Sequence, residues 1–258
     1  IGVHGEDYID IKVHCFVSCV CDGLKKRGLD QRPFYFGVWD AKFAISDRYQ
    51  LRYHANDISQ EFFRSWFERL YGVSVREWYD PDLSQADNLA VMTDLVRDRT
   101  ETDCVMVMLD MFHMPERENK FNQNPFPHYL MLQETGDPQT WFVHDPDYRW
   151  EGVMEREKVI HAIMQPTVDG GYAFDIGQAR TPDPEDLKAY FEACFIKQRN
   201  PIADAVRSIV TAHLDGKDGL SLADLELAVR ELPVLTIRKY AYEHGFAFFW
   251  RALKLPSS

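Results

Sequence analysis

The sequence of 258 residues lacks any long hydrophobic run, since no stretch reaches the roughly 18 apolar residues that a transmembrane helix needs. Its first residues, IGVHGEDYID, lack the basic and apolar segments of a signal peptide. They also lack an initial methionine, so we expect the true N-terminus to be missing or processed. Internal repeats and low-complexity segments are absent as well. We therefore expect a cytoplasmic protein with no membrane partner.

Positive charge is scarce, because 29 Lys and Arg residues stand against 41 Asp and Glu, which gives a formal net charge of −12. Non-specific nucleic-acid binding needs the opposite sign, so nucleic acid is not an expected partner. The negative charge does attract cations, polyamines among them.

Cysteine is also sparse. Five cysteines, an odd number at modest density, argue against a disulfide-stapled domain and favour a reduced intracellular protein.

Apolar residues are plentiful, and their spacing divides the chain into elements. Hydrophobic content is 45%, enough for a packed core. Apolar residues recur every four positions from Cys15 to Lys26, and Gly28 ends this predicted helix. Amphipathic patterns predict helices over 59–71 and 87–99. Short apolar or aromatic runs predict strands over 34–43, 50–54, 103–109, 129–133 and 141–144.

The stretch Thr181-Pro-Asp-Pro184 marks a boundary, since every later pattern is helical. The predicted fold class is α+β, with an N-terminal helix packed on an antiparallel sheet over residues 1–180 and a helical extension over 181–258. The very aromatic segment 241–253 fits a core, the wall of an acceptor site or the face of a homodimer. The helices predicted in the extension span 185–199, 201–214, 221–231 and 234–253.

Three cysteines, Cys15, Cys19 and Cys21, lie within seven residues. This cluster could form a metal knuckle, a disulfide framework or one reactive thiol with structural neighbours. The sequence contains no CxxC pair, and a helix would direct Cys21 away from the face that the other two share. We therefore expect no metal site here. Cys19 and Cys21 are better interpreted as small buried apolar side chains.

Cys15 differs from its neighbours because it begins the predicted helix. Backbone N–H groups point outward at a helix N-terminus, where the helix dipole is positive, and both effects favour a thiolate. The same N–H groups can stabilise an oxyanion that forms beside the sulfur. Many cysteines at such positions are nevertheless inert, so the position alone leaves both interpretations open.

A thiol nucleophile needs an imidazole base, and the base needs a group that orients it. His128 begins one predicted strand, and Asp145 follows the next strand, 17 residues further on. In an antiparallel pair joined by a turn, the start of one strand lies beside the end of the other. We therefore expect His128 and Asp145 to lie within hydrogen-bond reach, with His144 on the opposite face.

The order of helix-terminal Cys, strand-start His and Asp on the following strand is that of papain-like enzymes. Several blocks of the chain, which together cover about residues 8–165, resemble the butirosin biosynthesis protein H type of papain-fold acyltransferase. A narrower resemblance is to the petrobactin-pathway branch, which moves a dihydroxybenzoyl group from an aryl carrier protein onto spermidine. The blocks are HCFVSCVCDGLKKRG, FYFGVWDAKF, DCVMVMLDMFHMPE, HYLMLQETGDPQTWFVHDP and VMEREKVIHAI.

The resemblance implies a reaction and its residues. Cys15 matches the nucleophile, His128 the base and Asp145 the orienting acid. The acyl group would arrive on the phosphopantetheine of an acyl or aryl carrier protein and leave on a small-molecule amine, without any other cofactor. A cysteine hydrolase, such as a peptidase, amidase or thioesterase, uses the same three residues and stays an alternative. A non-catalytic protein that assembles through its helical tail is the third.

Substrate contacts can be suggested from residue type. If the amine is a polyamine, carboxylates should line its channel, and Asp40, Asp47 and Asp110 are the candidates. Each of them is alternatively a solvated surface charge. The aromatic density of residues 34–79, with Tyr35 and Trp39 among its members, suggests a pocket for an aryl group or an ordinary core.

Overall fold

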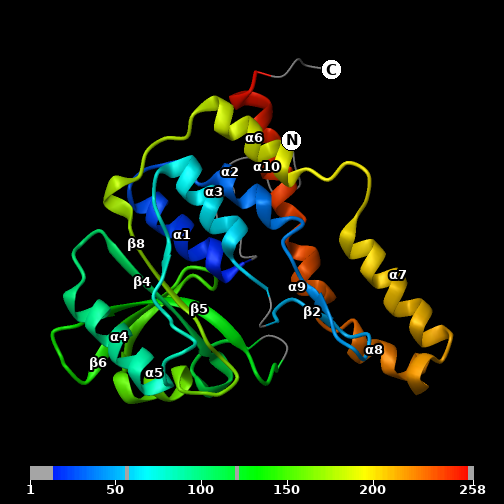
Figure 1. Ribbon diagram of the computed structural model, residues 1–258, viewed down its shortest axis with the longest axis horizontal. Coiled ribbons are helices and arrows are strands. Elements are labelled where there is room, and N and C mark those ends of the chain that lie inside the picture. The colour runs from blue at the N-terminus through cyan, green and yellow to red at the C-terminus, as the bar shows by residue number, and fades with distance from the viewer. Residues whose placement is uncertain (1–13, 56–57, 120–121, 255–258) are drawn as a thin grey trace. The chain divides into compact units, whose positions relative to one another are not determined.

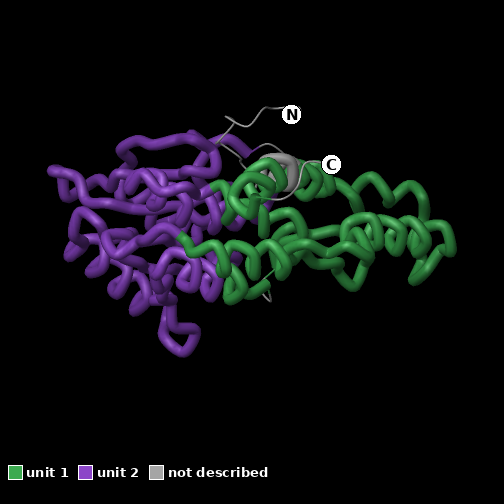
Figure 2. Tube along the Cα trace, turned by 90° about the horizontal axis from the view of Figure 1, so that it is seen from above, with its two compact units in different colours: residues 1–13, 32–63, 182–258 green, residues 14–31, 64–181 purple. Residues whose placement is uncertain are grey.

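The computed structural model describes residues 14–55, 58–119 and 122–254. The chain divides into two compact units (Figure 2). The sheet unit comprises residues 14–31 and 64–181, and the described part of the helical unit comes from residues 32–63 and 182–258. The fold is a mixture of helices and antiparallel sheets with helices at the C-terminal end, as the α+β pattern predicted. The division at residue 181 stays a prediction.

The sheet unit is built on a six-stranded sheet with the strand order β3-β8-β4-β5-β6-β7, in which every neighbouring pair is antiparallel (Figure 1). Its central strand, β4, is buried from Val105 to Asp110, which explains its continuous apolar run. The strands are β3 (Arg76–Glu77), β4 (Asp103–Asp110), β5 (Pro127–Glu134), β6 (Thr140–Asp145), β7 (Trp150–Glu155) and β8 (Gly171–Asp175).

Helix α1 (Cys15–Lys26) packs on one face of this sheet. Phe16 is fully buried, and its ring meets those of Tyr129 and Tyr172 edge-on at 6.0 and 5.1 Å. The helix ends as the sequence predicted. Gly28 adopts a positive φ of 69°, which glycine reaches without steric cost, and its N–H donates to the carbonyl of Lys25.

Two helices, α4 (Gln85–Asp98) and α5 (Arg156–Ile163), pack against β4. Leu89 of α4 and Ile163 of α5 line one small cavity together with Val107, whose side chain points to the face opposite Tyr129. The sheet is therefore covered on both sides. Among the described residues, no helix has the length and apolar character that crossing a membrane requires.

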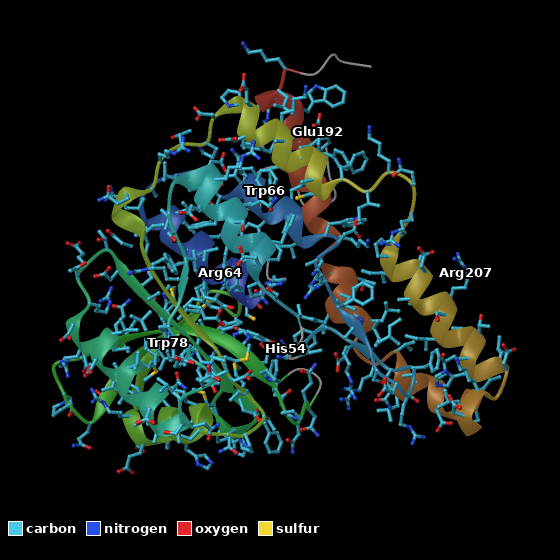
Figure 3. All side chains as sticks on the ribbon, viewed as in Figure 1. His54, Arg64, Trp66, Trp78, Glu192 and Arg207 are labelled. Atoms are coloured by element: carbon cyan, nitrogen blue, oxygen red, sulfur yellow. The ribbon has the colours of Figure 1, made fainter. Side chains whose placement is uncertain are left out.

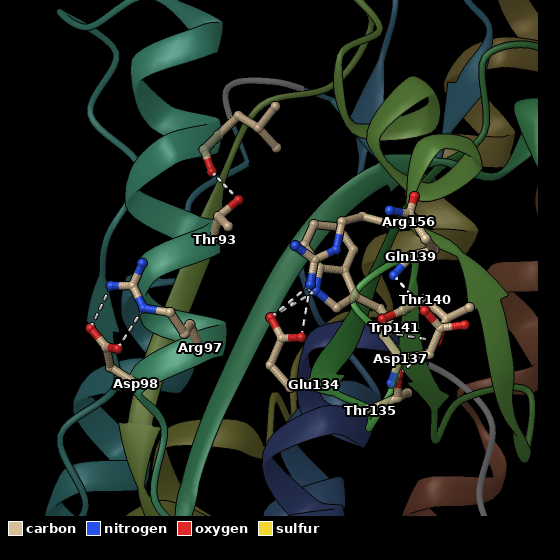
Figure 4. A network of polar contacts seen from close by, with 11 residues as sticks. Thr93, Arg97, Asp98, Glu134, Thr135, Asp137, Gln139, Thr140, Trp141 and Arg156 are labelled. Carbon is tan, nitrogen blue, oxygen red and sulfur yellow. Dashed lines mark hydrogen bonds and ion pairs between the residues drawn. The ribbon is translucent and has the colours of Figure 1, made fainter.

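A polar network fixes the turn of the β5–β6 hairpin (Figure 4). Glu134 at the end of β5 accepts two hydrogen bonds from Arg156, at 2.7 and 2.9 Å, and one from the indole N–H of Trp141 at 3.2 Å. The hydroxyls of Thr135 and Thr140 are 2.6 Å apart across the turn. Because register in a hairpin is set by its turn, this network also fixes which residues of β5 and β6 lie side by side.

The helical unit begins with a difference from prediction, because the strand expected over 34–43 is wrong. These residues form α2 (Arg32–Tyr35) and the 3₁₀ helix η1 (Phe36–Val38). Pro33 lies in the first turn of α2, a position that proline favours. The Tyr190 hydroxyl donates to the Phe34 carbonyl at 2.7 Å. The Phe36 ring packs within 5.5 Å of three phenylalanines, Phe191, Phe246 and Phe249.

Residues 44–53 are held to the C-terminal helices of the same unit. Glu231 accepts hydrogen bonds from Arg52 at 3.0 Å and from the Tyr53 backbone N–H at 2.8 Å. Leu51 is buried in one apolar cluster with Ile202 and Leu235. The elements are β1 (Ala44–Ile45), β2 (Leu51–Arg52), α6 (Pro184–Cys194), α7 (Pro201–Leu214), α8 (Leu225–Ala228), α9 (Leu232–Ile237) and α10 (Tyr240–Ala252), with the short 3₁₀ helices η4 (Lys217–Gly219) and η5 (Leu222–Asp224).

The other predicted elements agree with the structure to different degrees. Helix α3 (Glu61–Tyr71), helix α4 and the strands β2, β4, β5 and β6 lie where the patterns placed them. The helix predicted over 221–231 is divided between η5 and α8, and that over 234–253 is divided between α9 and α10. Strands β7 and β8 and helix α5 had no predicted counterpart. β7 contains a glycine and alternates between exposed and half-buried positions until Met154, so it lacks an apolar signature.

Gly171 in β8 leaves room for a neighbouring indole, so its replacement gives a first prediction. A Cβ at Gly171 would collide with the indole of Trp78, labelled in Figure 3, whose N–H donates to the Met106 carbonyl at 3.0 Å. We expect Gly171→Ala to lower the free energy of unfolding by about 1–3 kcal/mol, as overpacking does. Urea unfolding measures the change. Gly136→Ala, where nothing lies within 4 Å, should change it by less than about 0.5 kcal/mol. Equal effects of the two variants would contradict the collision.

Candidate active site

The β5–β6 hairpin brings His128 and Asp145 together. Its register pairs Met131 with His144, which brings Asp145 to the level of Leu130, two residues from His128 and on the same face. The His128 Nε2 and Asp145 Oδ1 atoms are 2.9 Å apart. Only 3% of His128 is exposed and none of Asp145. The expectation that these two side chains lie within hydrogen-bond reach is confirmed.

Cys15 lies at the first position of α1 and meets the same imidazole. Cys15 lies close enough to this ring that its hydrogen bond and its charge are among the causes that raise the pKa of His128. Because Nε2 faces Asp145, Nδ1 is the nitrogen that remains for the sulfur. Cys15 is half-buried, whereas His128 behind it is buried, so a substrate can reach the sulfur before the base. The structure therefore brings the three residues predicted from the sequence into one chain of contacts.

The start of α1 is well defined. His14 is the N-cap residue, and its Nδ1 atom accepts the Val17 backbone N–H at 3.5 Å. The Ser18 N–H donates to the His14 carbonyl at 2.8 Å, which is the first helical hydrogen bond. The N–H groups of Cys15 and Phe16 belong to the first turn, where helical carbonyls are not in reach as acceptors. Backbone N–H groups at such a position can stabilise an oxyanion formed beside the Cys15 sulfur.

Burial and charge act against each other at the imidazole and the carboxylate. Burial alone would lower the pKa of His128, but the charge and hydrogen bond of Asp145 and then the contact with Cys15 raise it well above 6.5. Burial alone would raise the pKa of Asp145, but His128 and then Arg117 lower it below 3.8. Both shifts favour an imidazolium beside an ionised carboxylate. An imidazolium in turn stabilises a thiolate on its other side.

Arg117 is a member of the site that sequence reasoning missed. Its Nη2 atom donates to Asp145 Oδ2 at 2.8 Å, and only 3% of the Arg117 side chain is exposed. The guanidinium also lies over the Trp150 ring, with its carbon 3.9 Å from the ring centroid. Arg117 comes from the connection between β4 and β5, which shows no periodic pattern. A single arginine in such a segment gives no sequence signal of a buried role.

The loop between β6 and β7 adds two further contacts. The Tyr148 ring meets the His128 ring edge-on at 5.3 Å, and the Tyr148 N–H donates to Asp145 Oδ1 at 3.2 Å. Burial, followed by the charge of Asp147, raises the pKa of Tyr148, so its hydroxyl stays neutral. Asp147 accepts hydrogen bonds from the Ser18 hydroxyl at 2.6 Å and the His14 N–H at 3.2 Å. The sequence analysis did not single out either loop residue.

The remaining cysteines are distinct from Cys15. Cys19 and Cys21 are at most 1% exposed, which confirms that they are buried. Burial raises the pKa of Cys19 well above 9.0, and the charge of Cys15 adds to the rise. Burial also raises the pKa of Cys104 to about 11 and that of Cys194 to about 12. Cys19, Cys104 and Cys194 are thus held in the neutral, less reactive form. The described residues contain no group of three His, Cys, Asp or Glu side chains that could hold a metal ion.

The predicted substrate contacts are spread over both units. Asp110, in the sheet unit, is 1% exposed, and its carboxylate accepts hydrogen bonds from the backbones of Phe112 and Phe126 and from Thr167 at 2.7–3.0 Å. These contacts give Asp110 a structural role at the end of β4. They exclude the alternative of a solvated surface charge, while its place along an amine channel stays a prediction. Tyr35, in the helical unit, is only 7% exposed and belongs to the aromatic core there.

Trp39 and Asp40 form a pair of contacts with a lysine of the same helical unit. The Lys239 ammonium lies over the Trp39 ring, 3.2 Å from its centroid, and 3.8 Å from Asp40 Oδ1. Burial lowers the pKa of Lys239, although the charge of Asp40 opposes this shift. An aromatic face and a carboxylate thus surround one alkylammonium group.

Comparison with known proteins identifies the family of the chain. Residues 10–179 match the family model described as the DUF6005 N-terminal domain, and residues 185–258 match the DUF6005 C-terminal domain. The chain is 43% identical to petrobactin synthase from Bacillus anthracis over 245 residues. The aligned region covers 95% of this chain and 75% of that protein. This similarity supports the predicted relation to the petrobactin pathway. The butirosin-type, papain-fold description stays a prediction.

The contribution of Arg117 to stability can be measured against that of Arg156, which makes similar contacts in a more exposed place. Arg156 also binds a carboxylate, Glu134, and lies over an indole, Trp141, at 4.5 Å, but about a quarter of its side chain is exposed. We expect Arg117→Met to cost about 3 kcal/mol of unfolding free energy, because it leaves a buried carboxylate with one cation fewer. Arg156→Met should cost at most about 1 kcal/mol. Equal losses in urea unfolding would contradict this.

The same two variants should also differ in how their stability depends on pH. The lowered pKa of Asp145 contributes stability that is present above pH 3.8 and is lost as the pH falls through the folded-state pKa. Removing Arg117 removes part of the cause of that lowering, so the loss should begin at a higher pH. The acid-unfolding midpoint of Arg117→Met should therefore lie above those of the parent and of Arg156→Met. An unchanged midpoint would show that His128 alone holds the carboxylate ionised.

Proposed function

The chain belongs to the DUF6005 family, and we propose that it is an enzyme of siderophore biosynthesis that acylates an amine through a thioester on Cys15. The acyl group comes from the phosphopantetheine thioester of an acyl or aryl carrier protein, and the catalytic core is papain-like. The contact chain Cys15–His128–Asp145 carries the proposal, since it supplies a nucleophile, a base and an orienting carboxylate. The 43% identity to petrobactin synthase supports the pathway.

The first half-reaction transfers the acyl group to the protein. The Cys15 thiolate attacks the thioester carbonyl, and the N–H groups of Cys15 and Phe16 stabilise the resulting oxyanion, an effect of about 3 kcal/mol per donor. The bond between the acyl carbon and the phosphopantetheine sulfur then breaks. That sulfur leaves with the proton of the His128 imidazolium, so the step ends with an S-acyl cysteine and a neutral imidazole. Thioester exchange is nearly isoenergetic.

The second half-reaction forms the amide. The amine attacks the acyl carbon, His128 takes the proton that the amine loses, and the Cys15 thiolate leaves. The electrostatics support this change of role. Contact with Cys15 is one cause of the raised pKa of His128, and acylation removes the charge of that sulfur. Acylation therefore lowers the pKa of His128, so more of the imidazole is in the neutral form that can accept a proton, while Asp145 continues to hold it through Nε2.

A cysteine hydrolase with the same three residues is the alternative function, because water can replace the amine in the second half-reaction. Incubation with an acyl-loaded carrier protein and mixed amines separates the two. Transfer predicts that amide forms faster than free acid, and that a suitable amine suppresses hydrolysis. Free acid that accumulates at the same rate with and without amines would support the hydrolase instead.

The role of the thiol is tested by substitution. We expect Cys15→Ser and His128→Asn to lower the rate of amide formation by at least about 10³-fold, since each removes a group that takes part in bond making. Cys104→Ser serves as the control, because its thiol is held neutral by burial and should be dispensable. Mass spectrometry of the intact protein should find the acyl adduct on Cys15. A Cys15→Ser variant with parental activity would end the proposal.

We also propose that Trp39 and Asp40 bind an ammonium group of the acceptor amine. In the structure the Lys239 ammonium lies over the ring and near the carboxylate, which supports their fit to an alkylammonium ion. An acceptor with a second ammonium group, such as a polyamine, would displace it. The net charge of −12 favours such a ligand but gives no selectivity between sites.

Amine kinetics test this site. Asp40→Asn and Trp39→Leu should raise the KM for a polyamine about tenfold, and Lys239→Met should lower it, because the competing ammonium is gone. Acylation of Cys15 by the carrier protein should not change in any of the three. Lys217→Met is the control, since Lys217 lies over the Tyr49 ring at 4.6 Å in an exposed position. Unchanged KM values in the first two variants would contradict the proposal.

A further inference from the structure

The loop that follows Asp145 makes contact with the nucleophile's helix as well as with the base. Asp145, at the end of β6, binds His128 through the 2.9 Å contact with Nε2. Asp147, two residues later, accepts the Ser18 hydroxyl at 2.6 Å and the His14 backbone N–H at 3.2 Å, both on its Oδ1 atom. One short segment of chain therefore contacts both the imidazole and the first turn of the helix that carries the thiol.

Asp147 binds a residue before Cys15 and another after it in the sequence. His14 and Ser18 are four residues apart, so they lie one above the other on the same side of the first turn. The Ser18 N–H and the His14 carbonyl close that turn at 2.8 Å. Ser18 is 2% exposed, so its hydroxyl is held away from competing water. A carboxylate bound to both residues fixes the height and rotation of the turn that carries the sulfur.

We propose that Asp147 is a positioning residue that ties the first turn of α1 to the loop that orients His128, and so fixes the separation of thiol and imidazole. This inference rests on the proposed function of Cys15. Tyr148 extends the same connection, because its N–H reaches Asp145 and its ring packs against His128. The loop thus positions the base through Asp145 and Tyr148, and the nucleophile through Asp147.

A simpler explanation is that Asp147 only stabilises the helix, as carboxylates near helix N-termini do. Burial raises the pKa of Asp147, and the charge of His128 and the hydrogen bonds from Ser18 and His14 oppose this rise. Both hydrogen bonds need an acceptor oxygen at this position, and an asparagine would offer one without the charge. We therefore expect the position of the acceptor oxygen to matter more than its charge.

Three variants separate position from charge. Asp147→Ala removes the acceptor, Asp147→Asn keeps an acceptor oxygen without the charge, and Ser18→Ala removes the shorter bond while the carboxylate stays. Asp175→Ala, which removes an exposed carboxylate that also accepts a backbone N–H, that of Gly177 at 2.8 Å, serves as the control away from the thiol. Each is made in the full chain, and the folded fraction is measured by circular dichroism and thermal unfolding. Ser18→Ala keeps the test decisive if Asp147→Ala does not fold.

The readout is the steady-state rate of amide formation from an acyl-loaded carrier protein and a polyamine. We expect Asp147→Ala to lower kcat by about 10–100-fold with the KM for the amine unchanged, since misplacing a reacting group by about 1 Å costs up to about 100-fold. Asp147→Asn should restore kcat to within about threefold of the parent, and Ser18→Ala should fall between them. Asp175→Ala should keep the parental kcat.

Two results would overturn the inference. A folded Asp147→Ala variant with parental kcat would show that the contact serves only stability. An Asp147→Asn variant as slow as Asp147→Ala would show that the charge, and not the position, is what matters. Failure of the proposed function looks different. If iodoacetamide labels Cys15 of the parent no faster than Cys104, or if Cys15→Ser forms amide normally, there is no thiol–imidazole pair to position.

Discussion

The ion pair between Asp145 and Arg117 is the interaction on which the rest of the site depends. A carboxylate with no exposed surface is costly unless hydrogen bonds and opposite charge compensate for its lost hydration. Here Arg117, His128 and the Tyr148 N–H surround both of its oxygens. Because His128 and Arg117 together keep the carboxylate ionised, His128 is held through Nε2, and its other nitrogen is left for the sulfur. The position of the base thus follows from the way one buried charge is neutralised.

The sheet supplies the rigidity that this arrangement needs. His128 and Asp145 belong to neighbouring strands of one hairpin, whose turn is fixed by the contacts of Glu134 with Arg156. A slip of one residue would move His128 or Asp145 to the opposite face of the sheet. Cys15, by contrast, comes from a helix far away in the sequence. That helix is held by packing, by the contacts of His144 with Asp22 and Lys26, and by the loop after Asp145.

The sequence predicted those parts of the fold that depend on local rules. Helix α1 and its end at Gly28 follow from spacing and from glycine's conformational freedom, and the pairing of His128 with Asp145 follows from counting residues around a hairpin. Arg117 and Asp147 could not be found in this way. Each lies in an irregular connection, and its role depends on a burial that only the assembled fold provides. The aromatic run 34–43 failed for a related reason, because aromatic residues suit both helices and strands and their tertiary partners decide.

Residues 32–63, between α1 and α3, belong to the helical unit, and this limits where the chain can be truncated without loss of folding. Residues 32–63 share their core with the C-terminal helices, through Phe34 with Tyr190, Phe36 with Phe191 and Phe249, and Tyr53 with Glu231. A fragment cut after the first family region would keep these aromatic side chains and lose the surface that covers them. The two DUF6005 regions are thus successive along the gene product but are not autonomous folding units, and truncation between them is expected to yield an aggregating N-terminal piece.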